Sequence, residues 1–91
     1  MVKVTKRLEI KNRLGLHARA AALLVQMVNR FSADVKFSKD GQAVDGRSII
    51  GVLSLGAAKG SKVRVQASGR DAKEAMRAIE ELIEKKFHES K

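Results

Sequence analysis

The sequence predicts an α+β fold in which a sheet of four strands carries helices on one face. Four segments alternate apolar and polar residues with a period of two, which is typical of strands with one buried face. Two longer segments place apolar residues three and four positions apart, as amphipathic helices do, and a short apolar stretch adds a third helix. The predicted order is strand, helix, strand, strand, short helix, strand, helix. One-faced strands favour a sheet that is covered on one side and exposed on the other.

Length and composition limit the classes of protein that the chain can represent. Its 91 residues predict a single domain over residues 1–91, and 44% hydrophobic residues suffice for a core. The absence of cysteine excludes disulfides and thiolate metal sites, and no apolar run is long enough to span a bilayer. The first residues lack the apolar core of a signal peptide, so we expect a cytoplasmic protein without membrane insertion. The net charge of +9 predicts acidic partners.

The first strand is predicted over residues 2–10, where only Lys6 interrupts the alternation. A loop over residues 11–16 then leads into the first helix. The core face of that helix is formed by Ala21, Leu24, Val25, Val28 and Phe31. Three further apolar residues lie at the margin of this face: Ala20, Leu23 and Met27. Such a margin is typical either of the edge of a core or of a rim on which partners dock.

The middle of the chain predicts a hairpin followed by a short helix. Val35 and Phe37 belong to the second strand, and Asp40-Gly41 predicts a tight turn into a short third strand. Ser48 stands where an N-cap is expected, before a short helix over residues 49–55.

The last part of the chain predicts a fourth strand and a third helix. Val63, Val65 and Ala67 form the inward face of the strand. Asp71 and Glu74 form a D-x-x-E capping pair for a helix whose apolar face runs from residue 72 to residue 87.

A histidine occupies the junction between the first loop and the first helix. His17 falls at the helix start, where unpaired backbone N–H groups and the helix dipole favour anions such as phosphate. Arg19 adds a guanidinium that can hold phosphate oxygens in bidentate fashion. A neutral imidazole is a nucleophile, so the pair suits a histidine that receives a phosphoryl group and passes it on. By themselves, however, these features favour a histidine that only caps or packs the helix.

Two motifs reverse that preference. Gly15-Leu16-His17-Ala18-Arg19 resembles the active-site signature of HPr, the histidine-containing phosphocarrier family of the sugar phosphotransferase system. The segment 47–56 resembles the regulatory-serine segment of the same family, and the resemblance covers nearly the whole chain. It implies an open-faced β-sandwich, in which a four-stranded antiparallel sheet is covered on one face by three helices in the order βαββαβα.

The resemblance also implies a function: a phosphocarrier in sugar transport rather than an enzyme. His17 would accept the phosphoryl group on Nδ1 from phospho-enzyme I and pass it to a histidine of an acceptor protein, while Arg19 neutralises the group. Ser48 would be the target of a regulatory serine kinase and phosphorylase. The predicted docking residues are Ala20, Leu23, Met27, Ile49, Ile50 and Leu53. No metal or organic cofactor is expected, and the expected state is a monomer.

The chain departs from the family pattern at Ala20, where relatives carry proline. Proline pre-organises a first helical turn, so alanine predicts a less rigid turn rather than a lost function. Three alternatives stay open. The chain could be a regulatory relative, for example of the nitrogen-related branch, that acts mainly by protein binding, and Ser48 could be a plain helix cap. A basic nucleic-acid-binding module fits the charge, but only three aromatic residues are present, all Phe on apolar faces, so no nucleic-acid partner is expected.

Overall fold

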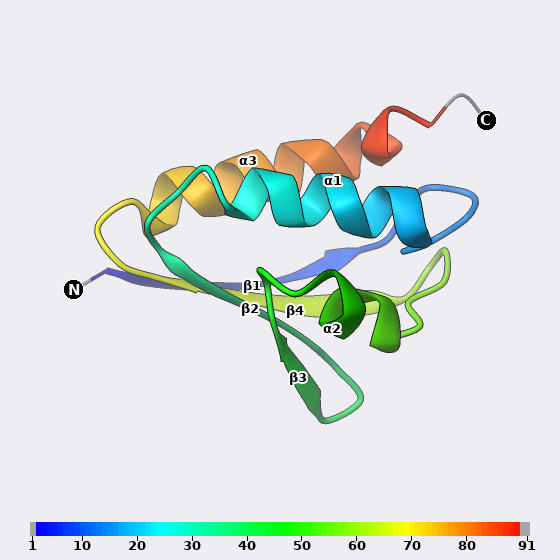
Figure 1. Ribbon diagram of the computed structural model, residues 1–91, viewed down its shortest axis with the longest axis horizontal. Coiled ribbons are helices and arrows are strands. Elements are labelled where there is room, and N and C mark those ends of the chain that lie inside the picture. Colours follow the sequence, from blue (N-terminus) through cyan, green and yellow to red (C-terminus); the bar gives the residue numbers. More distant parts are fainter. Residues whose placement is uncertain (1, 90–91) are drawn as a thin grey trace.

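The computed structural model describes residues 2–89 and has the predicted order of elements. They are β1 (Lys3–Glu9), α1 (Ala18–Val28), β2 (Asp34–Lys39), β3 (Gln42–Asp45), α2 (Ile49–Ser54), β4 (Lys62–Ser68), α3 (Ala72–Glu84) and the single turn η1 (Lys86–His88). The strands form one antiparallel sheet in the order β1-β4-β2-β3. In Figure 1, α1 and α3 lie side by side over one face of this sheet, and α2 packs beside α1 and next to β3. The predicted α+β architecture is therefore confirmed.

The core lies between the sheet and helices α1 and α3. Along β4, Val63 and Val65 are buried whereas Lys62 and Arg64 are exposed, as the alternation predicts. The helices supply the opposing apolar surface, with Ala21, Leu24, Val25 and Val28 from α1 and Ala75, Met76, Ile79 and Ile83 from α3. Each large side chain buried in this way stabilises the fold by about 1.5–3 kcal/mol. This packing holds α1, and with it the residue that precedes α1, in a fixed place above the sheet.

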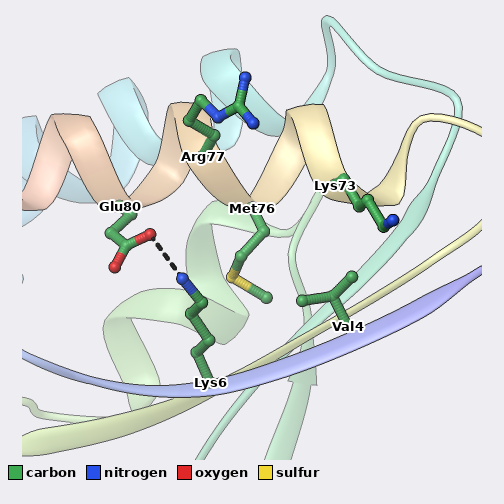
Figure 2. A pocket seen from close by; sticks show the side chains of 6 residues that line it. All are labelled: Val4, Lys6, Lys73, Met76, Arg77 and Glu80. Atoms are coloured by element: carbon green, nitrogen blue, oxygen red, sulfur yellow. Dashed lines mark hydrogen bonds and ion pairs between the residues drawn. The ribbon is translucent and has the colours of Figure 1, made fainter.

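Lys6 is the residue that interrupts the alternation in β1, and it lies on the face of that strand that points toward α3. Its Nζ is 3.0 Å from Oε1 of Glu80 on α3. Figure 2 shows the side chain rising from the strand toward Glu80, with Val4 and Met76 beside it. Because β1 is an outer strand of the sheet, the ammonium group still reaches solvent. An inward-pointing charge on an edge strand opposes pairing with another chain.

Asp71 precedes α3, as predicted, but it does not cap that helix. Its side chain makes no capping hydrogen bond within α3, so the expected pairing with Glu74 is wrong. Instead, its carboxylate accepts hydrogen bonds from the backbone N–H groups of Ser32, at 2.9 Å, and Ala33, at 2.8 Å. The hydrogen bond from Ser32, followed by that from Ala33, holds the pKa of Asp71 below its usual range despite some desolvation. Asp71 thus stabilises the turn between α1 and β2 rather than its own helix.

The last helix ends earlier than its apolar pattern predicts. α3 stops at Glu84, and a turn follows over Lys86, Phe87 and His88, whose φ angles of 55°, 54° and 57° are left-handed. Phe87 nevertheless remains in the core, with 2% of its surface exposed. Left-handed backbone is unfavourable for such residues, and burial of the Phe87 ring offsets that cost. After this turn, Glu89 lies against the loop that precedes α1, where it contacts Asn12 and Leu14.

Candidate functional site

His17 is the N-cap residue of α1, as the sequence predicts. Its backbone is extended, with φ −79° and ψ 179°, and its carbonyl accepts the first helical hydrogen bond from Ala21 N–H at 2.9 Å. Its side chain does not cap the helix, and 30% of that side chain is exposed. The imidazole therefore stands at the positive end of the helix dipole and within reach of solvent.

The loop before His17 is held in place by hydrogen bonds to Ala57 and Asn12 and by the backbone conformation of Gly15. Leu16 N–H donates to the carbonyl of Ala57 at 2.9 Å, and Gly15 has a φ of +68°. A Cβ on Gly15 would lie 2.6 Å from that same carbonyl oxygen, so both conformation and space require glycine. Asn12, which is fully buried, donates from Nδ2 to the Gly15 carbonyl at 2.8 Å. These contacts fix the approach of the chain to His17.

Glu89 contacts His17 directly, and sequence reasoning missed it. Its Oε2 lies 3.1 Å from Nε2 of His17 and 3.0 Å from Nδ2 of Asn12, while Leu14 N–H donates to Oε1 at 3.3 Å. The hydrogen bond from Asn12 is the largest cause that keeps the pKa of Glu89 below its usual value, with smaller contributions from Leu14 and His17. His17 and Glu89 are 72 positions apart, so no local sequence pattern predicts their contact.

Basic residues lie after His17 on α1 and beside Glu89. Arg19 is exposed on the first turn of α1 and makes no hydrogen bond or ion pair with the residues that the structure describes. A hollow of about 360 Å³ beside Glu89 is lined by four more basic residues, Lys11, Arg13, Lys59 and Lys86. Of these, Lys11 is paired with Glu84 at 2.7 Å. The basic surroundings favour an anion such as a phosphoryl group near His17.

Ser48 is the N-cap of α2, which confirms the sequence prediction. Its Oγ accepts a hydrogen bond from Gly51 N–H at 2.9 Å. The neighbouring Arg47 does not face Ser48: its guanidinium donates to the carbonyl of Phe31 at 2.9 Å and to that of Ala33 at 3.3 Å. A phosphate on Ser48 would thus lie at the first turn of α2. Arg47 would not be free to pair with it, because its guanidinium is hydrogen-bonded to Phe31 and Ala33.

The predicted docking residues fall into three groups. On α2, Ile49, Ile50 and Leu53 are exposed, with 81% of Ile50 accessible, and on α1 Leu23 and Met27 are half-buried. Ala20 is different, because its side chain is fully buried. The prediction that Ala20 belongs to a docking surface is therefore wrong: it turns inward under the first turn of α1, into the core. Leu14, which the sequence did not single out, is 59% exposed shortly before His17.

Between residues 2 and 89, no helix has both the length and the apolar character needed to cross a membrane. In that same range, no cluster of three or more His, Cys, Asp or Glu side chains could hold a metal ion.

The fold and the site define a small α+β protein with a histidine at a helix start, and this chain matches a known family of such proteins. The family model described as "PTS HPr component phosphorylation site" matches residues 4–85. The phosphocarrier protein HPr of Xylella fastidiosa (strain Temecula1) is 44% identical over 82 residues, which are 90% of this chain and 92% of that protein. The chain belongs to the HPr family of the phosphotransferase system. Its predicted character, a phosphocarrier protein rather than an enzyme, is confirmed by this membership.

Solved structures agree with this assignment. The crystal structure of HPr-C-His from Thermoanaerobacter tengcongensis superposes with a TM-score of 0.89 at 46% identity, covering 100% of both chains. A structure of Bacillus subtilis Crh, the catabolite repression protein, has a TM-score of 0.74 at 38% identity and covers 91% of this chain and 95% of that one. Crh is described there as a dimer with a swapped domain. Carriers and a regulatory relative therefore share this fold.

Proposed function

We propose that His17 carries the phosphoryl group, accepting it on Nδ1 from phospho-enzyme I and passing it to a histidine of sugar-specific or regulatory acceptor proteins. The observation that carries the proposal is the position of His17 at the N-cap of α1. Its imidazole is partly exposed and makes no capping hydrogen bond to the helix. The location of the relay in the cytoplasm and the monomeric state are parts of the same proposal.

The transfer uses only groups that the site presents. The lone pair of Nδ1 attacks phosphorus, a P–Nδ1 bond forms, and the P–N bond to the donor histidine breaks with its electron pair returning to the donor ring. The backbone N–H groups of the first turn of α1 and the guanidinium of Arg19 offset the negative charge on the phosphoryl oxygens. The onward transfer is the same kind of step. The histidine of the acceptor attacks the phosphorus from the side opposite to Nδ1, and the P–Nδ1 bond breaks with its electron pair returning to His17.

The surroundings of His17 support docking of an acidic partner. The exposed apolar side chains of Ile49, Ile50 and Leu53 can form the centre of a contact, flanked on α1 by Leu23 and Met27. Arg19 is exposed on the first turn of that helix, and Arg30 is exposed just beyond its last residue. An apolar centre with a basic rim fits enzyme I and acceptors that present an apolar patch inside an acidic rim.

Ser48 is the second part of the proposal, as a site for a regulatory serine kinase and phosphorylase. Its support is the position of the residue immediately before the exposed Ile49 and Ile50. A phosphate there would add about −1.5 to −2 charge at the docking contact. The effect would be repulsion of an acidic partner, with the helix cap itself preserved.

The test is phosphorylation with phosphoenolpyruvate and a cognate enzyme I, followed by intact mass. The expected result is one phosphoryl group that is lost in acid and retained in alkali, as a P–N bond requires. His17→Ala should abolish the labelling, whereas His88→Ala, which removes the other histidine of the chain, should leave it intact. Acid-labile labelling that persists in His17→Ala would refute the assignment.

A regulatory role by protein binding is the second candidate, because Crh is among the similar structures. In that case the folded chain would bind its partners without accepting a phosphoryl group from enzyme I. The same labelling experiment separates the two, since a binding regulator stays unlabelled while its melting temperature shows that it is folded.

A further inference from the structure

We propose that Glu89 is a positioning residue for His17: its carboxylate accepts the Nε2–H of the imidazole and so leaves the lone pair on Nδ1, the atom that attacks phosphorus. This inference rests on the proposed function of His17 as the phosphoryl carrier. It goes beyond the family match, which covers residues 4–85 and does not reach Glu89.

The carboxylate of Glu89 is fixed by contacts on both of its oxygens. Oε2 lies 3.1 Å from Nε2 of His17 and accepts from Nδ2 of Asn12 at 3.0 Å, while Oε1 accepts from Leu14 N–H at 3.3 Å. Only 12% of its side chain is exposed. Asn12 in turn is fully buried and bonded to the Gly15 carbonyl. The carboxylate is therefore held against the same loop that positions His17.

The approach of Glu89 is equally determined. After α3 ends, the left-handed turn over Lys86–His88 is anchored by the buried ring of Phe87. His88 N–H donates to the carbonyl of Lys85 at 3.0 Å, and Glu89 N–H donates to that of Lys86 at 2.9 Å. A packed aromatic residue two positions before Glu89 thus directs its backbone toward the loop.

The chemistry of the contact selects one tautomer. A neutral imidazole has one N–H donor and one acceptor nitrogen, and an ionised carboxylate can only accept. Hydrogen bonds from Asn12, Leu14 and His17 favour the ionised form of Glu89, and four basic residues line the adjoining hollow. The proton therefore resides on Nε2, as it does on the nitrogen that faces the carboxylate in other His–carboxylate pairs.

The same contact persists through the transfer. When the P–Nδ1 bond forms, the Nε2–H stays in place, and the positive charge that the ring acquires is met by the carboxylate. No proton has to enter or leave the site, since the donor ring recovers its electron pair as its P–N bond breaks. The carboxylate touches no reacting atom, so its role is to orient and stabilise the ring.

The experiment compares wild type with Glu89→Gln, Glu89→Ala and Glu84→Gln. Glu84 is the matched control, because it is a carboxylate from the same end of the chain that pairs with Lys11 and has no contact with His17. Imidazole nitrogen chemical shifts report the tautomer, and the initial rate of phosphorylation at limiting enzyme I reports the consequence.

We expect wild type and Glu84→Gln to show His17 almost wholly with its proton on Nε2, and Glu89→Ala to show a mixture of tautomers. Phosphorylation of Glu89→Ala should be about tenfold slower than that of wild type. The rate for Glu89→Gln should lie between those of wild type and Glu89→Ala, because its amide oxygen can still accept a hydrogen bond. Melting temperatures serve to show that all variants are folded. Unchanged tautomers in Glu89→Ala, or an equal slowing in Glu84→Gln, would overturn the inference.

The result also separates this inference from the proposed function. If wild type is labelled on His17 and Glu89→Ala matches it in both tautomer and rate, the carrier role stands and the role of Glu89 is refuted. If wild type is not labelled at all, the proposed function fails, and with it the use of the tautomer in phosphoryl transfer. Nitrogen shifts then still report whether Glu89 orients the ring.

Discussion

The carboxylate of Asp71, directly before α3, lies 2.8 Å from the backbone nitrogen of Ala33, directly before β2. With its second hydrogen bond, to Ser32, it joins two parts of the chain that are 38 and 39 positions away in sequence. It therefore links the start of α3 to the turn that ends α1, so that the two helices over the sheet share one anchor.

The Asp71→Asn variant should be less stable than wild type, by several degrees in melting temperature at neutral pH. The amide can accept only one of the two N–H hydrogen bonds and presents a donor to the other. Because the folded-state pKa of Asp71 lies below its unfolded value of 3.8, its contribution is complete above that value and is lost as pH falls through the folded pKa. Urea unfolding at neutral pH and at about pH 2.5 measures this.

The difference between wild type and Asp71→Asn should shrink at the acidic pH. Asp34→Asn is the control, because this carboxylate is 86% exposed and its nearest cation, Arg47, is 3.9 Å away. A stability difference for Asp71→Asn that is the same at both pH values would show that the charge of Asp71 is not involved.

The Arg19→Lys variant should slow phosphoryl transfer by tens-fold while leaving the melting temperature unchanged. Lysine retains the charge but loses the planar fork, which corresponds to roughly 2 kcal/mol of charge-assisted bonding to the phosphoryl group. Stability should not change because Arg19 has no hydrogen bond or ion pair within the described part of the chain. Rapid-quench transfer from phospho-enzyme I measures the rate.

Arg64→Lys is the matched control for this experiment, since it makes the same chemical change at an exposed position of β4, on the face away from the helices. It should transfer at the wild-type rate. Equal rates for all three proteins would mean that Arg19 is a solvated cation without a part in transfer.

The Ser48→Asp variant should weaken phosphorylation of His17 by enzyme I, mainly through binding and more at low salt than at high salt. The new carboxylate stands at the exposed side of α2 beside Ile49, where it would meet an acidic partner. Aspartate is itself a good N-cap, so the melting temperature should change little. Initial rates over a titration of enzyme I provide the measurement.

Ser48→Ala separates the charge from the cap in that experiment. It removes the hydrogen bond to Gly51 N–H and should cost about 1 kcal/mol of stability without a change in the apparent affinity for enzyme I. If Ser48→Asp and wild type are phosphorylated equally at low salt, Ser48 lies outside the contact and is only a helix cap.

The Lys6→Val variant should self-associate in a concentration-dependent way. It restores the apolar alternation of β1, whose outer edge is unpaired in the sheet, and removes an ion pair that contributes at most about 1 kcal/mol. Val4 and Met76 lie beside Lys6 (Figure 2), so the change would extend the apolar strip that these two residues form. Sedimentation velocity across a range of concentrations measures the outcome.

Lys3→Val is the control, because it makes the same change in net charge on the same strand, but on the face away from the helices. It should behave like wild type. A monomeric Lys6→Val at the highest concentration would show that Lys6 does not protect the edge.

Features that depend on neighbouring positions could be predicted from the amino-acid sequence. The alternation along β4 set which residues face the core, the left-handed φ angles of Asp40 and Gly41 match the predicted hairpin turn, and Ser48 caps α2 as predicted. Each of these depends on residues within about four positions, and the period or cap chemistry is legible in the sequence itself. The position of His17 at the start of α1, with Arg19 on the first turn, was predictable for the same reason.

Contacts between segments that are distant in the sequence depend on how the helices and loops pack together. The burial of Ala20, the partner of Asp71 and the contact of Glu89 with His17 depend on where α3 and the turn after it pack against α1 and its preceding loop. From the local sequence, the carboxylate of Asp71 is expected to cap α3, and no local pattern predicts a partner for Glu89. Their actual partners lie 38 and 72 positions away, and only the packing of the apolar faces brings them within hydrogen-bond distance.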